Sequence, residues 1–183
     1  AYLAIVLIWS TTPLAIQWST QGTGFAFAVL ARMLIGTVVA ALLVLVWRIR
    51  FPLHARARRA YLVGGVGLFG AMALTYWGAR YVNSGLVSVL FGLSPLMAGV
   101  LAAVWLGEKS LTRAKVAGTL LGAGGLAVIF VHGSALGGEH ALAGLAALLA
   151  AVFIYSGSLV SLKRIGDDSP PLATTVGSLT VSL

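Results

Sequence analysis

The chain has 183 residues, of which 60% are hydrophobic and only 9% are charged, and its mean hydropathy is +1.02. Soluble domains carry about a quarter charged residues, so this composition excludes an ordinary water-soluble domain and indicates an integral membrane protein. The net charge of +8 does not indicate a nucleic-acid-binding face, because the positive residues lie between apolar runs, and the lack of cysteine excludes disulfides and thiolate metal sites.

Long apolar runs predict a series of membrane helices, each near the roughly 20 residues that cross a hydrocarbon core. The first six runs are Ala1–Trp18, Phe25–Trp47, Tyr61–Ala79, Leu86–Leu106, Val116–Val131 and Ala141–Leu162. A seventh begins after Pro170 and Pro171 and continues to the last residue, so we expect the chain to be a fragment of a longer protein. No signal peptide is expected at its start. The predicted fold class is an all-α transmembrane bundle.

Lysine and arginine collect at the ends of the even-numbered spans and the starts of the odd-numbered ones. Ten of the twelve lie there: Arg48, Arg50, Arg56, Arg58, Arg59, Lys109, Arg113, Lys115, Lys163 and Arg164. Because such residues accumulate on the cytoplasmic side, we expect the N-terminus to lie in the cytoplasm. The segment RIRFPLHARARR could be a specific partner site, but we interpret it as an orientation signal lying against anionic lipid.

Small residues at four-residue spacing form stripes on several predicted spans. The stripes are Gly67 and Ala71 in the third span, Gly99, Ala103 and Gly107 in the fourth, Ala114, Gly118 and Gly122 in the fifth, and Ala143, Ala147 and Ala151 in the sixth. Lipid gives helices no hydrophobic drive to associate, so small residues usually mark close helix contacts. We therefore expect a tight bundle of antiparallel neighbours.

Arg32 is the exception to the rule that charges lie outside the predicted spans, since it falls about 10 Å into the second one. An ionisable residue at this depth must face the bundle or a water-filled cavity. There it could attract an anionic group such as a substrate carboxylate. Alternatively, it could bond carbonyl groups at helix ends and hold the bundle together.

Two prolines, Pro13 and Pro95, lie near the middle of predicted spans. A proline in a membrane helix leaves a carbonyl without its helical partner, which is tolerated where protein, water or a hydroxyl group supplies another. Thr11, Thr12 and Ser94 could do so. Each proline makes either a static kink or a break of the kind with which many secondary transporters build a binding site and a moving part.

Polar and aromatic side chains away from the predicted helix ends could line a small, weakly polar cavity. The candidates are Trp9, Ser10, Pro13, Arg32, Thr75, Ser88, Ser94, Pro95, Tyr155 and Ser156. Serine and threonine also bond their own backbone in apolar helices, so each hydroxyl could instead be structural. The four acidic residues and three histidines lie in loops or at helix ends, so we expect no metal, no cofactor and no proton-relay carboxylate in the cavity.

A short internal similarity links the first and sixth spans, which contain IWSTTPLAI and IYSGSLVSL. Trp9 and Tyr155, at equivalent places, are 146 positions apart. Because an odd number of spans separates the two copies, the second would cross the membrane in the opposite sense. That arrangement is typical of an inverted repeat.

The run from Leu74 to Phe130 closely resembles the core of EamA-type transporters in the drug/metabolite transporter superfamily. It has an aromatic-rich exit from the third span, a Ser-Pro in the fourth, a Gly-Glu-Lys before Leu-Thr, and a glycine-rich fifth span. The resemblance implies ten helices in two inverted five-helix repeats around a central substrate cavity, with both termini cytoplasmic. Residues 1–132 would be the first repeat, and residues 141–183 would begin the second.

The resemblance implies a secondary transporter of small organic metabolites, with export as the expected direction, working by alternating access in a bacterial inner membrane. The expected partners are a small-molecule substrate and membrane lipid. The candidates for gating or structural roles are Gly107, Glu108, Lys109, Gly118 and Gly122. We expect Gly107 to end the fourth span and Glu108 to pair with Lys115 or Arg113, setting the turn or latching a closed state.

Two alternatives stay open at this point. The chain could be a half-size transporter that works as a homodimer. It could also be an intramembrane enzyme that uses Ser156 or Ser158 with a histidine, although the GxSxG motif of hydrolases is missing. A nucleotide-driven pump is not expected, because the sequence lacks the GxxxxGK[ST] motif.

Overall fold

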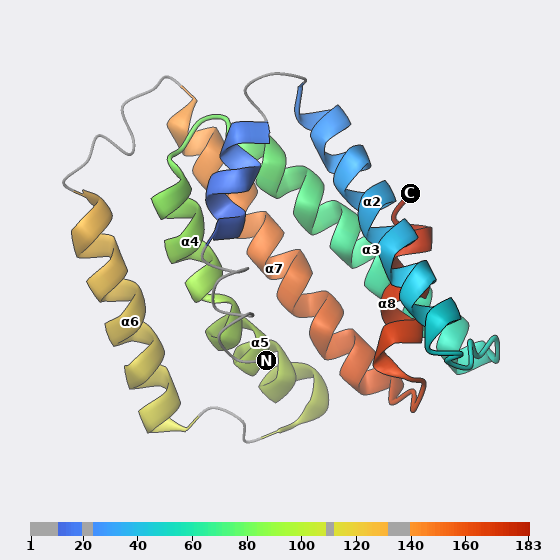
Figure 1. Ribbon diagram of the computed structural model, residues 1–183. Helices are drawn as coiled ribbons and strands as arrows, with labels where there is room; N and C mark the ends of the chain where they lie inside the picture. Colours follow the sequence, from blue (N-terminus) through green and yellow to red (C-terminus); the bar gives the residue numbers. More distant parts are fainter. Residues whose placement is uncertain (1–10, 20–23, 109–111, 132–139) are drawn as a thin grey trace.

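The computed structural model describes residues 11–19, 24–108, 112–131 and 140–183, and every regular element among them is an α-helix. Residues 11–19 form a short helix. It is followed by α2 (Phe25–Val46), α3 (Ala55–Gly78), α4 (Ser84–Gly92), α5 (Ser94–Leu106), α6 (Arg113–Val131), α7 (Ala141–Ile165) and α8 (Pro171–Val181) (Figure 1). Four described stretches are long and apolar enough to cross a membrane: Ala26–Val46, Ala55–Gly78, Ser84–Leu106 and Ala141–Ile165. The predicted all-α membrane bundle is confirmed.

The fourth predicted span is one stretch in length but two helices in structure, because Leu93 separates α4 from α5. Pro95 lies in the first turn of α5, where a missing N–H group costs little because it would have no helical acceptor. The Leu93 N–H donates to Leu90 O at 3.0 Å, closing a tighter turn at the break. The predicted interruption at Pro95 is therefore confirmed.

The end of α5 also follows the prediction. Gly107 caps the helix in the left-handed conformation with φ 66°, which favours glycine because no Cβ is present to clash. The Glu108 N–H then donates back to Ala102 O at 3.4 Å. This turn directs the chain out of α5 and toward α7.

Some neighbouring helices in the bundle are antiparallel and others are parallel (Figure 1). In α3 and α7, Gly78 lies against Gly144 and Gly64 lies near Leu162, so these two helices are antiparallel. In α3 and α8, Tyr61 contacts Gly177 and Gly65 contacts Val181, so these two are parallel. These directions fit a chain whose successive membrane crossings reverse direction, because α3, α7 and α8 correspond to the third, sixth and seventh predicted spans.

Several glycines permit this close packing. A Cβ added to Gly67 would overlap the Ser158 Cβ, and one added to Gly144 would lie 3.0 Å from the Gly78 carbonyl oxygen. The predicted stripe of Gly67 and the fully buried Ala71 is thus a helix contact. On α7, Ala147 and Ala151 are buried as expected, whereas Ala143 is exposed.

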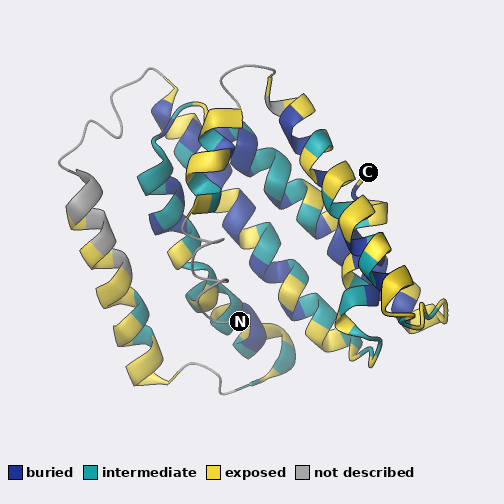
Figure 2. Cartoon of the chain, viewed as in Figure 1, coloured by how far each residue is buried: buried dark blue, intermediate teal, exposed yellow. Residues whose placement is uncertain are grey.

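The stripe on α6 behaves differently. A Cβ added to Gly118 or to Gly122 would meet no described atom within 4 Å, and both glycines are exposed. Helix α6 lies at the edge of the bundle and packs on α4 and α5 with another face (Figures 1 and 2). The expectation that these two glycines mark a contact is therefore wrong for the described part of the chain.

Candidate functional site

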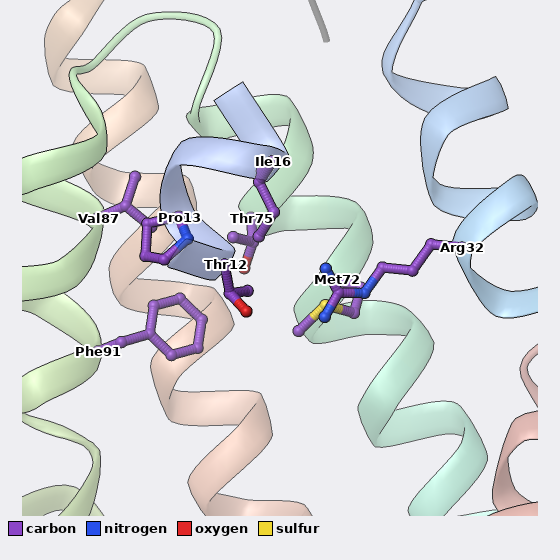
Figure 3. Close-up of a pocket in the computed structure, with 8 residues that line it drawn as sticks. All are labelled: Thr12, Pro13, Ile16, Arg32, Met72, Thr75, Val87 and Phe91. Carbon is purple, nitrogen blue, oxygen red and sulfur yellow. The ribbon is translucent and has the colours of Figure 1, made fainter. Parts of the chain in front are cut away.

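A cavity of about 240 Å³ lies between the short helix 11–19 and helices α2, α3 and α4. Its described lining consists of Thr12, Pro13, Ile16, Arg32, Met72, Thr75, Val87 and Phe91 (Figure 3). Most of these side chains are apolar, and a few polar groups converge among them, as is usual for small-molecule sites. Three of the predicted cavity residues meet here, namely Pro13, Arg32 and Thr75.

Arg32 reaches the cavity from the flank of α2. The buried side of this helix includes Val29 and Met33, which are one turn apart, and Arg32 immediately precedes Met33. Its side chain extends from α2 toward Met72 (Figure 3). Arg32 thus contributes to the described cavity lining, although the residue as a whole is exposed.

Thr75 lies in the cavity wall, but its hydroxyl proton is donated to a backbone carbonyl of its own helix. The residue is only 1% exposed, and its Oγ1 donates to Ala71 O at 2.6 Å. Thr75 therefore both lines the cavity and bonds the backbone of its own helix, which are the two roles that the sequence left open for it. Its hydroxyl oxygen can still accept a hydrogen bond, whereas its proton is already committed.

Four predicted cavity residues lie around the break between α4 and α5 and outside the described cavity lining. Ser88 donates to Ser84 O at 3.1 Å within α4, and Ser156 of α7 donates to Ser94 O at 3.3 Å. The Ser94 hydroxyl is buried and has no hydrogen-bond partner in the described chain. Ser94 thus does not supply the bond expected of it beside Pro95. Instead, Ser156 connects this broken segment to α7.

Tyr155 lies behind the cavity wall. Its ring packs against Phe91, with 6.3 Å between the ring centroids and 53° between the planes. Tyr155 itself lines a second cavity of about 210 Å³, bounded by α3, α7 and α8. It therefore positions a cavity residue rather than lining the first cavity. Trp9 and Ser10 fall outside the described residues.

Sequence reasoning did not propose five of the eight lining residues as cavity candidates: Thr12, Ile16, Met72, Val87 and Phe91. Their spacing carries a signal, because Val87 and Phe91 are four residues apart and so share one helix face. Met72 likewise lies three residues before Thr75. Taking the neighbours of Thr75 and Pro13 at helical spacing would have identified Met72 and Ile16.

Ion pairs hold the opposite end of the bundle, where the positive loops meet. Glu108 Oε2, just after α5, lies 2.6 Å from Lys163 Nζ in the last turn of α7. The expected partners of Glu108, Lys115 and Arg113, were wrong. The physical reason is that α5 runs parallel to α7, so the turn at Gly107 brings the carboxylate to the end of α7. Lys109 falls outside the described residues.

A second pair joins the start of α3 to the loop after α7. His54 Nε2 lies 2.8 Å from Asp167 Oδ1, and the Asp167 side chain is only 5% exposed. Polar neighbours, first Ser169 and then His54, lower the pKa of the Asp167 carboxyl below its usual range. Both pairs attach to the C-terminal end of α7, so this helix end is tied to α3 and to α5.

The comparisons with known proteins agree with the membrane fold. The sequence model of the EamA-like transporter family matches residues 1–131. A Streptantibioticus cattleyicolor protein named "Probable terminal-alkyne amino-acid exporter" is 32% identical over 133 residues, which are 73% of this chain and 44% of that protein. The Bacillus subtilis "Uncharacterized transporter YvbV" is 33% identical over 107 residues, which are 56% of this chain and 34% of that protein. The matched part is less than half the length of either relative, and no solved structure matches the chain.

Proposed function

Because the chain belongs to the EamA-like transporter family, we propose that it works in a secondary transporter that exports a small organic metabolite by alternating access. The observation that carries this proposal is the cavity of about 240 Å³ that places Arg32 among apolar side chains. An arginine at this depth in a membrane protein indicates a substrate or ion pathway unless it is structural. The names of the two relatives, one an exporter and one a transporter, support the same function.

The proposed domain organisation has a first five-helix repeat over residues 1–132 and a second repeat beginning at residue 141. The family match over residues 1–131 supports the first boundary. The opposite directions of α3 and α7 are those of a third and a sixth membrane crossing. In this scheme, the cavity borders the first repeat, and α7 and α8 are the first helices of the second.

The broken helix supplies the moving part in this proposal. Phe91 lines the cavity and lies two residues before the break at Leu93. A change of angle at the break would therefore move Phe91 relative to α5. At the far end, the pair between Glu108 and Lys163 would hold α5 against α7 while that end is closed.

Export can be tested with the purified chain in liposomes preloaded with a radiolabelled terminal-alkyne amino acid or with leucine. We expect saturable release that is faster than from protein-free liposomes. If a panel of amino acids and related carboxylates is released no faster than from empty vesicles, the proposed function is wrong.

Alternating access can be tested by locking the end that carries the ion pairs. The chain has no cysteine, so Glu108→Cys and Lys163→Cys can be joined by a short thiol-reactive crosslinker. We expect the crosslink in the double-cysteine variant to stop release. In either single-cysteine variant, we expect the crosslinker to leave the release rate as it was before treatment. A crosslinked protein that still transports at the full rate would contradict movement at this end.

The proposed location is a bacterial inner membrane, with the arginine-rich end of the bundle in the cytoplasm. Single cysteines at Arg58 and Arg80, both exposed and at opposite ends of α3, can report it. An impermeant thiol reagent should label Arg80→Cys in intact cells. It should label Arg58→Cys only after the cells have been permeabilised. The reverse pattern would refute the orientation.

A further inference from the structure

Arg32 lies inside a candidate membrane span and has no partner within the described chain. Its guanidinium carries five N–H donors, and none of them makes a hydrogen bond or ion pair with a described residue. The structural alternative, in which Arg32 bonds helix-end carbonyls, therefore finds no support among these residues. Arg32 is exposed within the described chain, but an arginine inside a membrane span without a protein acceptor is costly, so its acceptor should come from outside the chain.

The described acidic residues cannot serve as that acceptor, because they lie at the other end of the bundle. Glu108 pairs with Lys163, and Asp167 pairs with His54. Asp168 follows Asp167 in the same loop. Among the described residues that line the cavity, Arg32 is the only charged one. The site thus offers a positive charge to an anion and no carboxylate to a cation.

Part of the apolar wall lies across the cavity from the guanidinium. Figure 3 shows Phe91 on α4 and Arg32 on α2 at opposite sides, with Thr12 between them. The Phe91 ring is fixed from behind by its contact with Tyr155. A ligand that fits this arrangement has an anionic end and an apolar end.

The volume limits the size of the ligand. The cavity has a volume of about 240 Å³. Pockets for drug-sized ligands are usually about 300–1,000 Å³. The space is therefore below this range and suits a smaller compound.

We infer that this cavity selects small amphipathic monocarboxylates, with the carboxylate on Arg32 and a short hydrocarbon body against Phe91 and Val87. The inference rests on the proposed transport function for its biological meaning, but binding can be measured without transport. Because the described wall offers no carboxylate to an ammonium group, a free amino group is not required. An α-keto acid should bind at least as well as the amino acid with the same carbon skeleton, and both should bind better than the matching amine.

The test uses three probes that share an isobutyl group: leucine, its α-keto acid, and isopentylamine, which is leucine without the carboxyl group. Equilibrium binding of the radiolabelled α-keto acid to the purified chain in detergent micelles is measured, and the other two probes compete with it. We expect competition by leucine and little competition by isopentylamine. Equal competition by the amine, or no binding of the α-keto acid, would overturn the inference.

Two substitutions assign the two ends of the ligand. Arg32→Gln should weaken binding of the α-keto acid by at least about tenfold, as expected for loss of a charged hydrogen-bond donor, and Arg32→Lys should weaken it less. Phe91→Ala should weaken binding of the α-keto acid while leaving that of pyruvate, which has almost no hydrocarbon body, nearly unchanged. Arg80→Gln is the matched control, because Arg80 lies at the end of α3, outside the described cavity lining, and should have no effect.

The thermal midpoint of each variant shows whether it is folded. If Arg32→Gln unfolds the protein, Arg32→Lys carries the test. A folded Arg32 variant that binds all three probes as the unsubstituted chain does would overturn the inference. Binding that follows the expected order without any release from liposomes would instead refute the proposed function and leave the inference standing.

Discussion

The contact between α3 and α7 and the exposed face of α6 carry the same sequence pattern in different surroundings. In the first, an added Cβ at Gly144 would lie 3.0 Å from the Gly78 carbonyl oxygen and 2.9 Å from the Tyr81 Cβ. In the second, an added Cβ at Gly118 would meet no described atom within 4 Å. Small residues at four-residue spacing therefore show where two backbones can approach, and other features decide whether they do.

What distinguishes the two helices is the number of sides on which they are covered. Helix α3 packs against α2, α7 and α8, so its glycines face neighbours in several directions. Helix α6 packs on α4 and α5 from one side and presents Leu120, Leu121 and Val128 outward. Such apolar exposure is what a lipid-facing surface requires.

The largest expected effect comes from filling the close contact. We predict that Gly144→Ala destabilises the purified chain by about 2 kcal/mol, within the range for overpacked sites, because its neighbours include a carbonyl of α3 that cannot move independently. The measurement is the thermal midpoint in detergent micelles. A midpoint equal to that of the unsubstituted chain would mean that α3 and α7 do not pack as described.

Gly118→Ala is the matched control on α6. With no described atom near the added methyl group, we expect no loss of stability and a gain of up to about 1 kcal/mol from higher helix propensity. The same thermal assay applies. A loss as large as that of Gly144→Ala would show that α6 has a packed partner on this face.

The contact between α7 and the start of α5 offers a second, smaller contrast, between the two serines Ser156 and Ser94. Ser156→Ala removes the hydrogen bond to Ser94 O, so we expect a loss of about 1 kcal/mol. Ser94→Ala removes a buried hydroxyl that has no partner in the described chain, so we expect no loss or a small gain. Thermal midpoints of both variants check this, and the opposite order would place the important hydroxyl on α5.

Local sequence chemistry predicted much of this fold. The apolar runs located the helices, Pro95 located the break to within two residues, and Gly107 marked the end of α5. The partner of each glycine stripe could not be predicted, because spacing along one helix contains no information about its neighbours. The same limit explains the wrong partner assigned to Glu108, since Lys163 is distant in sequence and near only in the folded bundle.

The cavity was predicted in part for a related reason. Arg32 and Pro13 stand out because each is rare in an apolar helix, and both line the cavity. Phe91 and Met72 are ordinary residues for a membrane helix, so nothing in their type distinguishes a cavity wall from a lipid contact. Only the arrangement of four helices around one space makes that distinction.

At its C-terminal end, α7 is held by exposed charges instead of glycine contacts, and the effects there should be smaller. Glu108→Gln should lower stability by no more than about 1 kcal/mol, since the pair with Lys163 is largely solvent-exposed. The loss should shrink at high salt. Arg113→Gln is the control and should have no effect in the same thermal assay. If Arg113→Gln lowers the midpoint and Glu108→Gln does not, the pairing is wrong.

The smallest expected effect is a loss of stability at acidic pH that comes from the pair between His54 and Asp167. Because neighbouring polar groups lower the pKa of Asp167 in the folded protein, its carboxylate stabilises the fold fully above the usual value near 3.8. That stabilisation is lost as the pH falls from this value through the lowered pKa of the folded state. Thermal midpoints across this acidic range should fall more steeply for the unsubstituted chain than for Asp167→Asn, and Asp168→Asn should behave like the unsubstituted chain. Identical slopes for all three would show that the contact between His54 and Asp167 does not help to hold α7 to α3.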